Sequence, residues 1–159
     1  MDGLKDISGN GNNGQAIGNP TQTTTGYNGT VYNSAMEFDG ITASYVDFGN
    51  PSIDCDSNWS VSWWINTHDN TERQQLWDLG RCGVYCAIGD DELGALSELC
   101  VGYNDGSWQQ LCTSTISTDT WYYVTYTHDN DNNIKLYLNG NLADYKSVSG
   151  SVSEGEQGE

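Results

Sequence analysis

Segment 59–65 constrains the fold of this chain most, because its apolar side chains recur at every second position until Trp64 interrupts the pattern. Side chains of a β-strand return to the same face with this period. The residues placed on one face are Trp59, Val61, Trp63 and Ile65. No segment shows a sustained 3.6-residue apolar stripe, so we expect little helix.

Other short apolar segments follow at intervals typical of a β-sandwich. Asn104–Gly106 and Asn139–Gly140 have the composition of hairpin turns. Residues 1–34 are rich in Gly, Asn and Thr and predict either a structured turn or a flexible lead. The remaining predicted strands cover residues 36–40, 45–48, 75–79, 83–88, 96–103, 108–116, 121–127 and 134–138. The pattern predicts an all-β sandwich.

Size and charge narrow the class of protein. The 159 residues fit one domain, and six Trp and ten Tyr can fill its core although hydrophobic residues make up only 36%. A net charge of -17 repels phosphate backbones and anionic lipids. No apolar run approaches the roughly 18 residues of a membrane-spanning helix. We therefore expect no nucleic-acid partner and no membrane insertion.

The five cysteines favour an oxidising environment, because reduced cytosolic proteins of this size seldom carry so many. An odd count leaves at least one thiol unpaired within the chain. Cys100 and Cys112 lie on either side of the predicted Asn104–Gly106 turn, so we expect them to be close in space, while a pairing of each with a distant cysteine stays open. The spacing of Cys82, Cys86, Cys100 and Cys112 does not fit a zinc site.

An opening segment and five later landmarks resemble the laminin G-like branch of the concanavalin A-like lectin/glucanase domains. The opening is Asp6–Gly14, read as D-I-S-G-N-G-N-N-G, and the landmarks are Ala35–Gly40, Tyr45–Asp47, Trp59–Ile65, Trp121–Val124 and Lys135–Gly140. The resemblance implies a jelly roll of two facing antiparallel sheets, with Trp121 and most aromatic residues of segment 59–65 in the interior. The matches extend over residues 6–140, and we expect the domain to cover residues 1–143, followed by an acidic Gly-, Ser- and Glu-rich tail over residues 144–159.

The family pattern also implies two terminal strands that this sequence does not display. One is expected before the Ser-Gly-Asn opening and the other after the Asn139–Gly140 hairpin, and both segments hold few apolar residues. An open sheet would leave edges unpaired. We therefore expect neighbouring chains to cover it in a homo-oligomer, a filament or another larger assembly, or the chain to be a fragment of a longer protein.

Catalytic residues are not predicted. The glucanase relatives carry paired carboxylates in an E-x-D-x-x-E strand, and this chain has no such segment. His68 and His128 each stand in a Thr-His-Asp-Asn string, which we interpret as two polar strand ends rather than parts of a triad. A glycan-active enzyme is the least favoured class.

The favoured function is that of a non-catalytic surface or structural module, extracellular or on a virion surface, that binds carbohydrate or a cell-surface glycan. The alternative is a purely structural component of a virion or an extracellular filament. Tyr103 and Trp108 flank the Asn104–Gly106 turn and can form a cross-strand pair that stacks on a sugar if exposed, or has a structural role if buried. Binding is expected at loops of one end of the sandwich, around 66–73 and 129–133.

Calcium is the expected inorganic partner, because related domains often bind it and the loops supply many oxygen atoms. Two candidate sets exist, and in both the same side chains can serve turn geometry alone. The first comprises Asp6, Asn10, Asn12 and Asp39, and the second comprises Asp129, Asp131 and Asn133.

Overall fold

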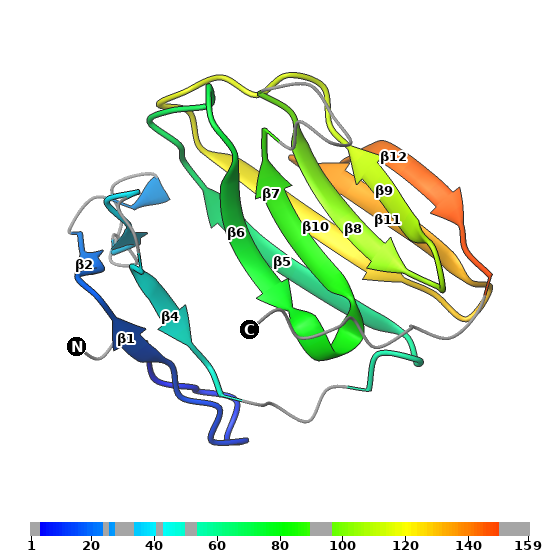
Figure 1. Cartoon of the computed structure of the whole chain (residues 1–159), viewed down its shortest axis with the longest axis horizontal. Helices are drawn as coiled ribbons and strands as arrows, with labels where there is room; N and C mark the ends of the chain where they lie inside the picture. Colours follow the sequence, from blue (N-terminus) through cyan, green and yellow to red (C-terminus); the bar gives the residue numbers. More distant parts are fainter. Residues whose placement is uncertain are drawn as a thin grey trace. The chain divides into compact units, whose positions relative to one another are not determined.

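The computed structural model describes residues 4–23, 26–27, 34–40, 43–49, 54–89 and 97–149. Residues 150–159 of the expected tail, and residues 1–3, 24–25 and 28–33 of the Gly- and Asn-rich lead, lie outside these ranges. The chain forms two compact units, Met1–Ile53 and Asp54–Glu159. Figure 1 shows the strands of both units.

The first unit contains two short antiparallel ribbons. Strand β1 (Gln15–Ile17) pairs with β4 (Tyr45–Asp47), and β2 (Thr21–Gln22) pairs with β3 (Met36–Glu37). Gly18 has a φ of 72°, and a Cβ at this position would collide with the carbonyl oxygen of Ala43. The described residues of the lead thus include strands β1 and β2, and the strands predicted at 36–40 and 45–48 are present as β3 and β4 but are shorter.

The second unit is a sandwich of two four-stranded antiparallel sheets. The front sheet, which lies nearer the viewer in Figure 1, has the order β6-β7-β8-β9, and the back sheet has the order β12-β11-β10-β5. The front strands are β6 (Gln74–Leu79), β7 (Val84–Ile88), β8 (Leu99–Asn104) and β9 (Trp108–Cys112), with the 3₁₀ turn η3 (Gly80–Cys82) between the first two. The back strands are β5 (Trp59–Ile65), β10 (Tyr122–His128), β11 (Asn133–Leu138) and β12 (Asn141–Ser147). The all-β, two-sheet prediction is confirmed.

No helix among the described residues has the length and apolar character needed to cross a bilayer.

The core of the sandwich lies between the sheets and follows the two-residue period of the strands. Burial alternates along β5, so Trp59, Val61, Trp63 and Ile65 share the inner side as predicted. Trp63 meets Trp77 of the front sheet edge-on, with ring centroids 5.2 Å apart. The fully buried members are Val84, Cys86, Ile88, Leu99, Val101, Tyr103, Leu111, Ile116, Val124, Tyr126, Ile134 and Leu136.

His128 is a polar residue at the end of β10, as predicted, and it also belongs to this core. It follows Val124 and Tyr126 on the inward face of β10 and is only 4% exposed. Its ring stacks between Trp59 and Tyr103, with centroid distances of 5.9 Å and 5.3 Å. Nδ1 donates to the Ser57 carbonyl at 3.1 Å, and the Tyr103 hydroxyl lies 3.4 Å from Nε2. Both ring nitrogens have partners, as burial of a polar ring requires.

Strand β12 supplies an element that the sequence did not reveal. The Asn139–Gly140 turn, with φ of 51° and 80°, sends the chain back antiparallel to β11. Most of β12 is exposed, because it forms the sheet edge, and its side chains therefore lack the apolar alternation of an inner strand. The prediction of a missing closing strand is wrong, and the expected domain boundary between residues 143 and 144 falls inside β12.

Two carboxylates tie this edge to the front sheet. Asp144 accepts a hydrogen bond from the Cys112 amide at 3.2 Å. Asp105 accepts one from the Ser149 amide at 2.8 Å and another from its hydroxyl at 3.1 Å. The hydrogen bond from the Ser149 amide is the main reason that the pKa of Asp105 falls to about 2.

Disulfides add covalent links within the second unit. Cys100 and Cys112 lie directly opposite each other on β8 and β9, with Cα atoms 4.2 Å apart, which confirms their predicted proximity. Cys55 and Cys82 join the segment before β5 to η3, with a Cα separation of 5.7 Å. Cys86 is a buried free thiol, and burial raises its pKa well above the usual value.

Candidate functional site

One row of residues crosses the outer face of the front sheet. Asp78, Tyr85, Gly102 and Gln110 lie opposite one another on β6, β7, β8 and β9. All of their neighbours in sequence except Gln109 belong to the core or pack against it, so the pleat directs this row outward. This row aligns, across four strands, the Asp78 carboxylate, the Tyr85 phenol, a glycine that has no side chain and the Gln110 amide.

The glycine in this row sets the position of the tyrosine ring. A Cβ at Gly102 would collide with three ring carbons of Tyr85. The phenol therefore lies against the backbone of β8 rather than standing away from the sheet. Beside it, Trp108 meets Tyr85 nearly edge-on, with centroids 5.4 Å apart and planes at 72°. Trp108 keeps 51% of its surface exposed. The two rings form an aromatic corner that opens to solvent.

Polar groups flank this corner. The Gln110 Nε2 atom is shielded from water and has no hydrogen-bond partner among the described residues. A shielded donor of this kind costs free energy as long as it has no acceptor. At the other end of the row, Gln75 donates to Asp78 at 3.5 Å, and Arg73 donates to Gln75 at 2.9 Å. Desolvation raises the pKa of Asp78, while the charge of Arg73 acts to lower it.

The predicted Tyr103–Trp108 pair is not formed. Trp108 lies opposite Asn104, and Tyr103 lies opposite Gln109. Tyr103 consequently points into the core, where it is fully buried against His128. Tyr85 is the aromatic partner of Trp108, which the sequence pattern did not predict. A bulky residue on β7 opposite a glycine on β8 is the available signal, but it becomes readable only once the strand register is known.

The first calcium candidate is divided between two ribbons. Asp6 precedes β1 and accepts hydrogen bonds from the amides of Ser8 at 2.7 Å and Asn12 at 2.9 Å. The hydrogen bonds from Ser8 lower its pKa. Asn10 donates its amide to the Ser8 hydroxyl at 3.3 Å, whereas Asp39 follows β3 on the other ribbon. The Asp6 carboxylate therefore closes a turn, and calcium binding by this set stays a prediction.

The second candidate is also a closed turn. One Asp129 oxygen accepts hydrogen bonds from the amides of Asp131 at 3.1 Å and Asn133 at 3.0 Å. The other oxygen pairs with the Lys135 ammonium at 2.7 Å, and this hydrogen bond is the main cause of an Asp129 pKa of about 2. Protein donors thus contact both oxygens, and calcium binding here also stays a prediction.

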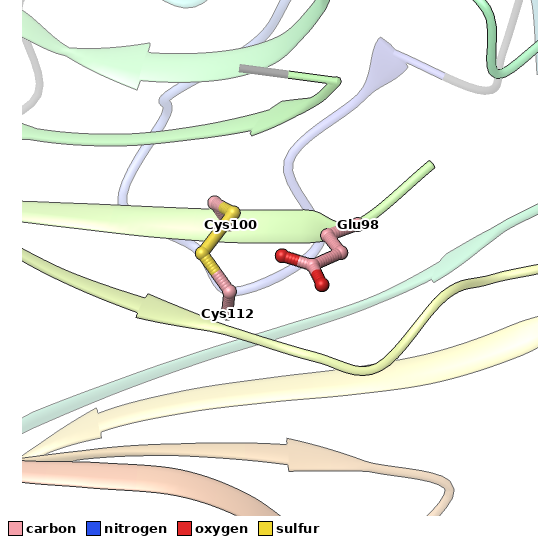
Figure 2. Close-up of side chains that lie close together, drawn as sticks. All are labelled: Glu98, Cys100 and Cys112. Atoms are coloured by element: carbon pink, nitrogen blue, oxygen red, sulfur yellow. A yellow bond between two sulfur atoms is a disulfide. The ribbon is translucent and has the colours of Figure 1, made fainter. Parts of the chain in front are cut away.

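Figure 2 shows the single group of three His, Cys, Asp or Glu donors that the described ranges bring within 4.8 Å, namely Glu98, Cys100 and Cys112. Both sulfur atoms belong to the disulfide. Because thiolates are the sulfur ligands of metals, this group is not a metal centre.

The loops expected to share one end of the sandwich lie at opposite ends. The pairing of Ile65 with Tyr122 places loop 66–73 at one end of the back sheet, and the pairing of Trp59 with His128 places loop 129–133 at the other. In the first loop, His68 Nδ1 lies 2.6 Å from an Asp119 oxygen, and both side chains are exposed. The aromatic corner on the sheet face is therefore a better candidate site than a joint loop surface.

Comparisons with known proteins agree with this fold. The crystal structure of the binding domain of paraclostridial mosquitocidal protein 1 is similar, with a TM-score of 0.73, 19% identity, and coverage of 98% of this chain and 41% of that one. The crystal structure of the botulinum neurotoxin serotype D binding domain has a TM-score of 0.69 and 17% identity, with coverage of 97% of this chain and 40% of that one. A candidate carbohydrate-binding protein from Bacteroides ovatus has a TM-score of 0.51 and 18% identity, with coverage of 65% of this chain and 30% of that one.

The chain thus spans about two fifths of the two toxin binding domains. At these identities the likeness establishes the fold alone. Curated protein sequences include no match. The family model of the concanavalin A-like lectin/glucanases superfamily matches residues 39–159, well over half of the sequence. The chain therefore belongs to the concanavalin A-like lectin/glucanases superfamily.

Proposed function

We propose that this chain is a non-catalytic carbohydrate-binding module and that its aromatic corner contacts a neutral sugar. The observation that carries the proposal is the exposed Trp108 ring beside Tyr85, which Gly102 allows to lie on the sheet. Sugar rings present C–H faces to aromatic side chains and hydroxyls to amides and carboxylates. Asp78 supplies an acceptor in the same row, and the Gln110 amide, whose Nε2 atom is shielded from water, donates to a ligand only if its side chain turns outward.

The charge of the chain favours a neutral ligand. With a net charge of -17 and a carboxylate at the end of the row, an anionic glycan would meet repulsion both at long range and at the site. A neutral glycan needs only stacking and hydrogen bonds.

The comparisons support a binding role without identifying a ligand. Similar folds occur in two toxin binding domains and in the candidate carbohydrate-binding protein from Bacteroides ovatus. The two disulfides favour an extracellular location, because such bonds persist in oxidising compartments. A secreted module that attaches to glycans fits both observations.

A glycan array with neutral, sialylated and sulfated members tests this proposal. We expect binding to neutral glycans, and a loss of up to about ten-fold in affinity for Trp108→Ala and Tyr85→Ala, since stacking on an aromatic ring contributes about 0.5–1.5 kcal/mol per contact. Tyr45→Ala is the matched control, because Tyr45 is a similarly exposed aromatic residue in the first unit. Unchanged affinity in both corner variants, or binding restricted to anionic glycans, contradicts the proposal.

A further inference from the structure

The outer face of the back sheet carries a second aromatic surface. Trp64 on β5 lies directly opposite Tyr123 on β10, with ring centroids 5.1 Å apart and planes at 43°. Trp64 is 44% exposed although it breaks the alternation of a strand whose other bulky residues face the core. This surface is separate from the Tyr85–Trp108 corner, because the two lie on outward faces of opposite sheets.

The aromatic surface continues diagonally across the back sheet. Tyr137 on β11 lies opposite Thr125, two residues along β10 from Tyr123. Such diagonal neighbours lie about 7–8 Å apart, within reach of aromatic side chains. Leu142 on β12 lies opposite Tyr137 and is 53% exposed. We call the residues Trp64, Tyr123, Tyr137 and Leu142 the diagonal row; it crosses all four strands.

Hydroxyl groups surround the diagonal row. Ser62 pairs with Thr125, and Ser60 pairs with Thr127, so both pairs share the outward face with Trp64 and Tyr123. The face therefore alternates flat apolar rings with small groups that donate and accept hydrogen bonds. An extended polysaccharide has the complementary pattern, since its rings present C–H faces and its edges present hydroxyls.

Charge selects among possible occupants. Lys135, the cation that the described residues place on this face, is paired with Asp129 at 2.7 Å. An anionic polymer would find little compensation here and would meet the net charge of -17. A second copy of the chain carries the same charge and is repelled as well. A neutral polymer meets neither obstacle.

We infer that the diagonal row is a second binding surface, which takes an extended neutral polysaccharide along the sheet face. A ligand on this surface would lie across several strands, whereas the front corner, with two rings and an adjacent amide, accommodates a single sugar. The module would then contact glycan from both sides of the sandwich.

Affinity electrophoresis of the full chain in gels that contain soluble neutral β-glucan or galactomannan tests the inference. We expect retardation that falls about ten-fold in affinity for Trp64→Ala and for Tyr123→Ala and that is largely retained in Trp64→Tyr, because the tyrosine ring can still stack. Tyr45→Ala, which alters an exposed aromatic residue outside both surfaces, should keep the wild-type retardation, and Trp108→Ala should lower the affinity for the polymer less than Trp64→Ala does. Circular dichroism and thermal unfolding verify that each variant is folded.

Three outcomes would overturn the inference. The first is unchanged migration of the wild-type chain in every polymer tested. The second is retardation that depends on Trp108 alone, which leaves the front corner as the polysaccharide site. The third is a dimer, detected by light scattering, that Trp64→Ala dissociates, which means that a second copy of the chain occupies the face. Failure of the front-corner proposal is distinguishable, since it appears on the array as unchanged affinity of the Trp108→Ala and Tyr85→Ala variants or as binding restricted to anionic glycans.

Discussion

Removal of the Cys100–Cys112 disulfide should destabilise the second unit by about 3 kcal/mol. The two residues are 12 apart in sequence, and the chain-entropy relation for a loop of this length gives about 3 kcal/mol at 25 °C. Their strands pair directly in the folded state, so the main effect of the bond is to restrict the unfolded chain. The test is urea unfolding of the Cys100→Ala/Cys112→Ala double variant, monitored by tryptophan fluorescence. The free energy of unfolding is extrapolated to zero urea and compared with that of the wild-type chain.

Cys86→Ala supplies the matched control, because it deletes a buried sulfur that forms no cross-link. The Cys55–Cys82 bond spans 27 positions, and the logarithmic dependence on loop length predicts that its removal costs about 0.7 kcal/mol more. A double variant that loses less than about 1 kcal/mol beyond the Cys86→Ala control would refute this reasoning. The reasoning would also be refuted if removal of the Cys100–Cys112 bond cost more free energy of unfolding than removal of the Cys55–Cys82 bond.

Other predictions concern the edge, the site and the core. The pKa of Asp105 is about 2 in the folded chain and about 3.9 in an unfolded chain. The carboxylate therefore contributes stability that is present above about pH 4 and is lost as the pH falls through 2. Asp105→Asn should remove this part of the pH dependence in urea titrations. Desolvation raises the pKa of Asp78, so glycan affinity should fall with decreasing pH at a higher pH than for an ordinary aspartate, and Asp78→Asn should flatten that profile in calorimetric titrations. Leu136→Ala should cost about 2–5 kcal/mol, since this side chain is fully buried, whereas the exposed Leu142→Ala should stay within about 0.5 kcal/mol of wild type in the same unfolding assay.

The sequence predicted the inner strands well because their apolar residues repeat with the period of a pleated strand. Segment 59–65 coincides with β5, and the segment predicted at 134–138 differs from β11 by one residue. Strand β12 escaped detection, because an edge strand exposes most of its side chains and needs no apolar alternation. The short strands β1 and β2 lie in a Gly- and Asn-rich lead where composition masks pairing.

Of the two rings in the candidate site, the sequence predicted Trp108 but not Tyr85, because the pairing of the rings depends on the register between neighbouring strands. A hairpin that pairs Asn104 with Trp108 turns Tyr103 inward, and a shift of one residue would have turned it outward. No local pattern around Asn104–Gly106 distinguishes the two registers. Tyr85 joins Trp108 only because β7 and β8 place it over Gly102, which is a tertiary relation absent from the local sequence.

The order of strands in the sandwich has a consequence for how the chain acquires its structure. The front sheet is a continuous meander, so each of its pairings closes a short loop, whereas the pairing of β5 with β10 must bring residues 65 and 122 together. Closing a longer loop costs more entropy, and non-local pairings slow folding. The meander should therefore form early and shorten the effective distance that β5 and β10 have to span. On this route the Cys100–Cys112 bond can be made before the back sheet is complete, and the aromatic corner would be assembled before the diagonal row.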